Sequence, residues 1–168
     1  IASALVQGLV VRWVQPIGVY MDQVNVPADW KPAHAQFMRD AAQTWADAAP
    51  GRFSFVFLSV QSEPCITVKW VKDHPMGQDP PTLGVSKLNL ATIGGTQYIS
   101  LVQIELATNS GSGAPNPDFI MRLLSIHELG HAIGLWGHSD DPNDIMFDTL
   151  DLQTGLSARD INTINRLY

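Results

Sequence analysis

The chain has a single cysteine, Cys65, among its 168 residues. One cysteine cannot form a disulfide within a chain, and it cannot supply a thiolate-rich structural zinc site. Cys65 lies in an apolar, strand-like stretch, where a small buried side chain is the expected state. Cysteine usage therefore gives no information about the redox compartment of the protein.

Long apolar runs are also missing. No run approaches the roughly 18 residues that a membrane-spanning helix needs, so we predict no membrane span. No signal peptide is visible, because residues Ile1–Val6 are apolar but have no basic flank. The formal net charge of −6 argues against a nucleic-acid or anionic-membrane partner. Without repeats or linkers, the length indicates one domain over residues 1–168, which we expect to be a monomer.

Against these absences, one predicted helix carries the sequence His-Glu-Leu-Gly-His from His127 to His131. Imidazoles at positions i and i+4 lie about 40° apart on one helix face, a spacing at which two ring nitrogens can bind one zinc ion. Glu128 lies about 100° round the helix, where its carboxylate can take a proton from a metal-activated water. The pattern indicates a zinc-dependent peptide hydrolase. The alternative is a helix with two surface histidines.

A second signal lies where this helix is expected to end. Gly134 follows His131 by three residues and can adopt a left-handed conformation that turns the chain sharply. His138 is the only histidine after this turn, and it could approach the metal as a third ligand. Three protein ligands leave the fourth zinc position open, which is the catalytic rather than the structural arrangement.

The pattern H-E-x-x-H-x-x-G followed by a third histidine resembles the metzincin clan, and its details resemble the matrixins. Met146 follows His138 by eight residues, like the methionine that lies in a turn beneath the zinc in that family. Residues Leu156–Tyr168 are similar to the closing helix of matrixin catalytic domains. The resemblance implies a secreted or extracellular zinc endopeptidase. It also implies a cleft between an upper part, about residues 1–134, and a lower part, about residues 135–168.

The spacing to the third histidine departs from the family pattern. Residues 135–137 fill a gap that is usually two residues long, and Gly137 is the residue best able to absorb the extra one. The offset of Met146 favours His138 as the ligand. A two-histidine site with a ligand from elsewhere remains the alternative, and Met146 could be an ordinary core residue.

Additional metals are less well supported. Asp148 stands where some metzincins have a tyrosine ligand, and residues 73–79 do not match the metal-binding loop of animal matrixins. His74 in that loop could bind a second zinc ion, which is a minor hypothesis. Calcium could bind acidic residues near the third histidine, but these lack a spaced ligand loop, and turn-forming acids are favoured. They are Asp140, Asp141, Asp144, Asp148 and Asp151.

The order of expected elements predicts an α+β fold, a twisted mixed sheet packed on an active-site helix and a C-terminal helix. Phe37, Ala41 and Trp45 recur at i+4 spacing, which indicates a helix. We predict helices over Pro32–Ala48 and Asn116–Gly134, the second capped by Asn116, and a last helix with a Ser157–Asp160 capping box. Strands are expected over Val10–Val14, Ile17–Met21, Phe53–Val60, Ile66–Val71, Gly84–Ala91 and Tyr98–Leu106.

Three functions follow from these residues. The favoured one is a zinc endopeptidase that acts on extended polypeptides, with Glu128 as general base and zinc held by His127, His131 and His138. The peptide would add along a sheet edge, and the family resemblance implies the Gly84–Ala91 strand for this pairing. By resemblance, residues 147–150 would form one wall of the specificity pocket. The alternatives are a zinc-binding module without hydrolytic activity and a zinc hydrolase of a non-peptide bond.

Overall fold

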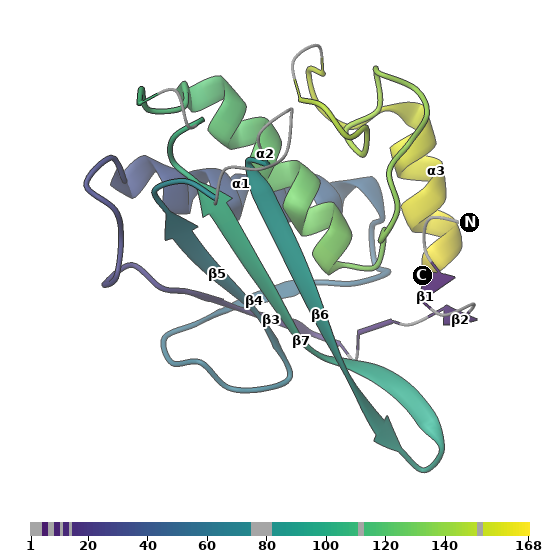
Figure 1. Ribbon diagram of the computed structural model, residues 1–168. Helices are drawn as coiled ribbons and strands as arrows, with labels where there is room; N and C mark the ends of the chain where they lie inside the picture. Colours follow the sequence, from purple (N-terminus) through teal and green to yellow (C-terminus); the bar gives the residue numbers. More distant parts are fainter. Residues whose placement is uncertain are drawn as a thin grey trace.

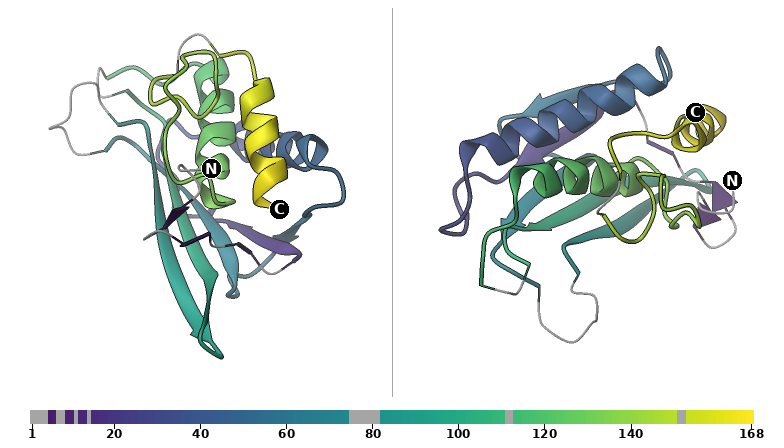
Figure 2. Two further views of the ribbon diagram at one scale, coloured as in Figure 1. Left: turned by 90° about the vertical axis from the view of Figure 1, so that its right-hand side faces the viewer. Right: turned by 90° about the horizontal axis from the view of Figure 1, so that it is seen from above.

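A five-stranded mixed sheet carries α1 and α2 on one face, and α3 lies beyond the C-terminal end of α2 (Figures 1 and 2). This arrangement is the α+β fold that the sequence predicts. None of the helices in the described part of the chain is long and apolar enough to cross a membrane. The computed structural model describes residues 5–6, 9–10, 12–13, 15–74, 82–110, 113–150 and 153–168.

The sheet has the strand order β4-β3-β5-β7-β6. The first three pairings are parallel, and β6 runs antiparallel to β7 at one edge. The inner strands are rich in β-branched and aromatic side chains, which suit a pleated, buried surface. The strands are β3 (Ile17–Met21), β4 (Phe55–Leu58), β5 (Cys65–Val71), β6 (Gly84–Ile93) and β7 (Thr96–Ala107), with a separate pair β1 (Leu5–Val6) and β2 (Leu9–Val10).

The core lies between the sheet and two helices, α1 (Pro32–Ala48) and α2 (Asp118–Ala132). Trp45 of α1 is fully buried, and its indole N–H donates to the Ile126 carbonyl of α2 at 2.8 Å. The buried face of α1 repeats at i, i+4 and i+8, as the sequence predicts. A short helix, α3 (Ala158–Leu167), closes the chain.

Most predicted elements are confirmed, with shifted ends. The Ser157–Asp160 capping box opens α3, and Cys65 is fully buried. Asn116 does not cap α2: Pro117 is the N-cap residue, and the Asn116 amide instead donates to the Ala107 carbonyl at 3.0 Å. The Asn116 amide is buried, so it meets the carbonyl at the end of β7 rather than the first turn of the helix.

The predicted strand over Val10–Val14 is wrong. The strand ends at Val10, and Arg12 and Trp13 belong to no regular element, while residues 11 and 14 lie outside the described residues. The Trp13 indole donates to the Ala132 carbonyl at 2.7 Å and so satisfies the end of α2, while the Arg12 carbonyl accepts the N–H of Ile99 in β7 at 3.5 Å.

The β6–β7 hairpin extends beyond the other strands (Figure 1). A register shift between Asn89 and Leu90 interrupts its pairing, and Gly94 and Gly95 turn the chain with positive φ angles. The near half of β6 faces α2, which brings an edge strand beside the His-Glu-Leu-Gly-His helix.

Candidate metal centre

His127 and His131 lie one turn apart on α2 and are both buried. Each ring is fixed by a short contact to a backbone carbonyl: His127 Nδ1 lies 2.7 Å from the Ile145 oxygen, and His131 Nδ1 lies 2.6 Å from the Leu135 oxygen. Because a carbonyl oxygen only accepts, both Nδ1 atoms must carry the proton. Both Nε2 atoms are therefore unprotonated and free to bind a metal.

The two Nε2 atoms lie 3.1 Å apart. With no proton on either nitrogen, two lone pairs face each other, an arrangement that a cation between them would stabilise. Burial lowers the pKa of His127 to about 4 and that of His131 to about 3, which keeps both rings neutral near pH 7. Neutral imidazole is the form that binds a metal.

The helix ends in a Schellman turn centred on Gly134. The Gly134 N–H donates to the His131 carbonyl, and the Leu135 N–H donates to the Gly130 carbonyl. Gly134 has a φ of 119°, which is costly for any residue with a Cβ. The turn reverses the chain as the sequence predicts, and it brings His138 back to the two helical histidines.

His138 completes a group of three histidines. Its ring centroid lies 5.4 Å from that of His127 and 5.0 Å from that of His131, and one ring nitrogen from each residue lies within 4.8 Å of the other two. His138 is exposed, whereas the other two are buried. Gly137, the residue expected to absorb the extra spacing, lies at a bend in the chain.

The donor set fits zinc. Two nitrogens on one tetrahedral zinc ion, each at about 2.0–2.1 Å, lie about 3.3 Å apart, close to the distance between the two helical Nε2 atoms. Three imidazole ligands would leave a fourth coordination position for water. Within the described ranges, these histidines are the one group of three or more His, Cys, Asp or Glu side chains arranged to hold a metal, and His74 is not among them.

Glu128 lies beside the histidines and is buried. Burial raises the pKa of its carboxyl to about 7, while a hydrogen bond from Ser86 opposes that shift. The Ser86 hydroxyl donates to Glu128 Oε2 at 2.7 Å. Gly84, two residues earlier on the same face of β6, leaves the space that this carboxylate occupies, because a Cβ there would overlap Oε1. A carboxyl group with these properties can accept a proton near neutral pH.

Met146 packs against α2 at the level of the two ligands. A Cβ on Gly130 would lie 2.5 Å from the Met146 sulfur and 2.8 Å from the Trp45 ring, so only glycine allows this contact. Met146 is buried, and its carbonyl accepts the N–H of Ser139 at 2.7 Å. The methionine thus contacts the helix at Gly130, the residue before His131.

A cleft of about 850 Å³ contains the histidines and Glu128. Residues 82–86 line it, as do residues 148–150 and Trp136. Phe147 was expected to share a wall with residues 148–150 but does not line the cleft, because residues 144–147 form a turn in which the Phe147 N–H donates to the Asp144 carbonyl. Leu124 adds an apolar side chain below the histidines.

The acidic residues that follow His138 face an arginine. Arg159 of α3 forms ion pairs with Asp140 at 2.7 Å, Asp144 at 3.2 Å and Asp141 at 3.6 Å. Asp141 also accepts the backbone N–H of Asn143, as a turn-forming acid does. Asp151, another residue considered for calcium, lies outside the described residues.

A fold of this kind, with three converging histidines and a buried glutamate beside them, defines the class of zinc metallopeptidases with the H-E-x-x-H motif. The family model described as matrixin matches residues 22–168, and the chain belongs to this family, whose members are zinc metalloendopeptidases. Over 167 residues the chain is 31% identical to macrophage metalloelastase from Rattus norvegicus, an alignment that spans 94% of the chain and 33% of that protein. It is 56% identical over 50 residues to the same enzyme from Oryctolagus cuniculus, covering 27% of the chain and 11% of that protein.

Several residues around the site could not be found from local sequence. Ser86 and Gly84 are more than 40 positions from Glu128, and no spacing rule connects them. Gly130 occupies an unspecified position of the motif, yet its missing side chain admits Met146. Arg159 was interpreted only as part of a helix, although its opposite charge to the nearby acids was a usable signal.

Proposed function

We propose that the chain is a zinc endopeptidase that cleaves extended polypeptides, with His127, His131 and His138 as metal ligands and Glu128 as general base. The observation that supports this most directly is the convergence of three histidine nitrogens beside a buried carboxylate in one cleft. Membership of the matrixin family supports the same reaction class. The chain spans about a third of the rat relative, so the activity is proposed for this part alone.

The chemistry divides between the metal and the chain. When bound, zinc would act as a Lewis acid on the attacking water and on the substrate carbonyl. Glu128 accepts a proton from the attacking water at the carboxylate oxygen that Ser86 leaves free, and then delivers it to the leaving amine. Its raised pKa suits both transfers, since the group can hold and release a proton near pH 7.

The substrate would add a strand to the sheet. β6 is an edge strand, and its residues Gly84, Val85 and Ser86 line the cleft beside Glu128. An extended peptide paired with this edge would gain affinity from backbone hydrogen bonds with little sequence preference. Side-chain preference would then come from residues 148–150 and Leu124, which also line the cleft.

We further propose that residues 1–168 act as one catalytic domain that works outside the cell. The cleft is lined by residues 82–86 and α2 and also by segments beyond residue 135, which supports an upper and a lower part. Matrixins are generally secreted, and this supports an extracellular location.

Cleavage of casein or a quenched fluorescent peptide tests the proposal. We expect cleavage by the zinc-loaded chain, loss with a chelator and recovery with added zinc. Glu128→Gln should remove activity and keep bound zinc, whereas Glu63→Gln, at an exposed glutamate outside the cleft, should leave both unchanged. Zinc binding without any cleavage would point to a non-hydrolytic module, and hydrolysis of esters alone would point to a different bond.

A further inference from the structure

We propose that Arg159 is a positioning residue for the third histidine. Its guanidinium holds the segment from His138 to Met146 against α3, and this contact sets how tightly the centre binds zinc. The inference rests on the proposed function, because it takes His138 to be a zinc ligand. According to this proposal, the closing helix contributes to zinc affinity, which neither the H-E-x-x-H motif nor the spacing to His138 indicates.

His138 needs support that the other two histidines already have. The rings of His127 and His131 are buried and fixed through Nδ1 to backbone carbonyls. His138 is exposed, and its ring forms no hydrogen bond to any residue that the structure describes. Its place therefore depends on the backbone that carries it, an irregular segment outside the helix.

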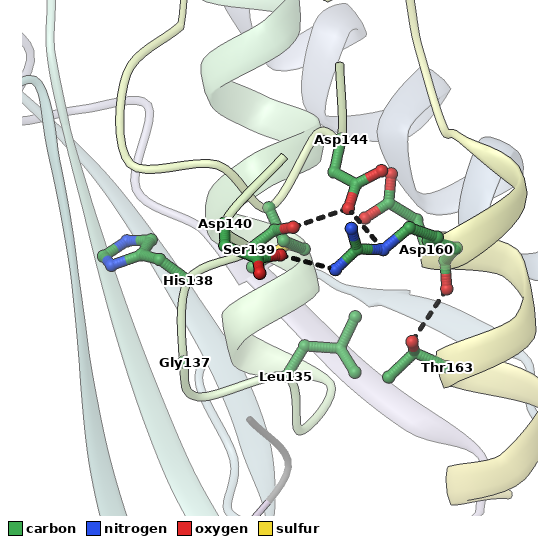
Figure 3. Close-up of a pocket in the computed structure, with 10 residues that line it drawn as sticks. Leu135, Gly137, His138, Ser139, Asp140, Asp144, Asp160 and Thr163 are labelled. Carbon is green, nitrogen blue, oxygen red and sulfur yellow. Dashed lines mark hydrogen bonds and ion pairs between the residues drawn. The ribbon is translucent and has the colours of Figure 1, made fainter. Parts of the chain in front are cut away.

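Arg159 holds that segment at three points, of which Figure 3 shows two of the carboxylates, Asp140 and Asp144. Its Nη2 lies 2.7 Å from Asp140 Oδ1, its Nε lies 3.2 Å from Asp144 Oδ2, and its Nη1 lies 3.6 Å from Asp141 Oδ2. All three carboxylates come from the six residues that follow His138. A planar guanidinium can serve three carboxylates in different directions, which a lysine ammonium does less well.

The contact with Asp144 carries most of the effect. The Asp140 side chain is 90% exposed, so its ion pair contributes little in water. The Asp144 side chain is 3% exposed, and removing its cationic partner would leave a buried charge unpaired. Asp144 also accepts a hydrogen bond from the Ser139 hydroxyl at 2.5 Å. The connection thus runs from Arg159 through Asp144 to Ser139, the neighbour of His138.

Ile145 and Met146 anchor the far end of the segment in the apolar core, and the arginine acts nearer to His138. A cavity of about 370 Å³ separates parts of the segment from α3, and it is lined by His138, Ser139, Asp140, Asp144 and Arg159 among others (Figure 3). At this cavity, the Arg159 guanidinium connects α3 to the carboxylates of the segment where side chains do not pack directly. Ile145 stays anchored by burial and by its N–H bond to Asp160, so loss of the arginine would loosen mainly the part nearest His138, which zinc binding would then have to order again.

Zinc affinity of the whole chain tests the inference, measured by competition with a chromogenic chelator of known affinity. Arg159→Gln should bind zinc about tenfold more weakly than wild type, the scale of effect seen when groups that orient metal ligands are removed. Arg166→Gln is the matched control, since it removes an exposed arginine from the same helix without touching the segment. His138→Ala shows how much zinc affinity is lost when the third ligand is removed entirely.

A second readout separates positioning from stability. Cobalt(II) in place of zinc has visible absorption that reports its coordination, and Arg159→Gln should shift this spectrum towards that of His138→Ala. A lower unfolding temperature of the metal-free chain with unchanged zinc affinity and cobalt spectrum would overturn the inference. If Arg159→Gln does not fold, Asp144→Asn decides in its place, with the same weakening expected and unchanged affinity overturning it.

The two proposals fail in different ways. If wild type does not bind zinc, or if His138→Ala binds it normally, the proposed function is wrong in its ligand set. If His138→Ala weakens binding while Arg159→Gln equals Arg166→Gln, the ligand set stands and the role of Arg159 is refuted.

Discussion

The three histidines belong to two regions that are built differently. His127 and His131 lie on α2, where helical repeat, burial and carbonyl contacts fix both rings. His138 lies on the exposed segment beyond Gly134, which is held by a turn, by Met146 and by ion pairs to α3. The comparison shows that a site can combine histidines whose positions are fixed by local structure with one whose position depends on contacts between distant segments.

The largest expected effect comes from comparing His127→Ala with His138→Ala. His127 is ordered before the metal arrives, so its loss should weaken zinc binding by roughly a thousandfold or more. His138 must lose freedom on binding, which offsets part of its contribution, and its loss should cost less, about a hundredfold. Chelator competition measures both. Equal losses would show that the exposed segment is as well ordered as the helix.

A smaller effect is expected at Ser86, which supports the helical region from β6. Ser86→Ala removes the hydrogen bond to Glu128, worth about 1.5 kcal/mol when the acceptor is charged, so kcat should fall roughly tenfold. KM and zinc affinity should stay unchanged, and Ser86→Thr should recover part of kcat. Ser100→Ala is the control, because its hydroxyl donates to the Asn89 carbonyl on the same hairpin and not to Glu128. A change in KM alone would assign Ser86 to substrate binding instead.

The smallest effect is on the stability of the metal-free chain as the pH changes. His127 and His131 have folded pKa values below 6.5, so the unfolded chain binds more protons and stability falls as the pH drops from 6.5 towards 4. Glu128 acts in the opposite direction between about 4.5 and 7, because its folded pKa is raised.

Thermal unfolding across this range, with the metal removed, checks the sign. The net change should be on the order of 1 kcal/mol between pH 6.5 and 5.5. Glu128→Gln removes the opposing group and should make the loss steeper. A wild-type chain that grows more stable as the pH falls through this window would contradict the burial of the two histidines.

The sequence was sufficient for everything that depends on local periodicity. The i, i+4 repeat placed α1 from Pro32 to Ala48, and the H-E-x-x-H spacing placed His127, Glu128 and His131 on one helix. The Gly134 turn followed from the need for a positive φ. His138 and Met146 could be identified from their separation along the chain, because that separation does not depend on how the sheet is arranged.

Contacts between segments that are distant in the sequence could not be predicted from local periodicity and spacing. Nothing near Trp13 indicates that its indole reaches α2, so an apolar run was interpreted as a strand. Asn116 has the sequence position of a helix N-cap, but its buried amide donates to the Ala107 carbonyl instead. Ser86, Gly84 and Arg159 become meaningful only when the sheet edge and α3 are placed against the active-site helix.

A single residue, Ile145, joins the closing helix to a metal-ligand candidate. The N–H of Ile145 donates to the Asp160 carboxylate at 2.9 Å, and the carbonyl of the same residue accepts from His127 Nδ1 at 2.7 Å. These two groups belong to consecutive peptide units on either side of the Ile145 Cα, so the link is one of position. Asp160 fixes the backbone of Ile145, and that backbone carries the oxygen that orients the His127 ring. The capping acid of α3 thus serves as an anchor for a histidine that it never touches.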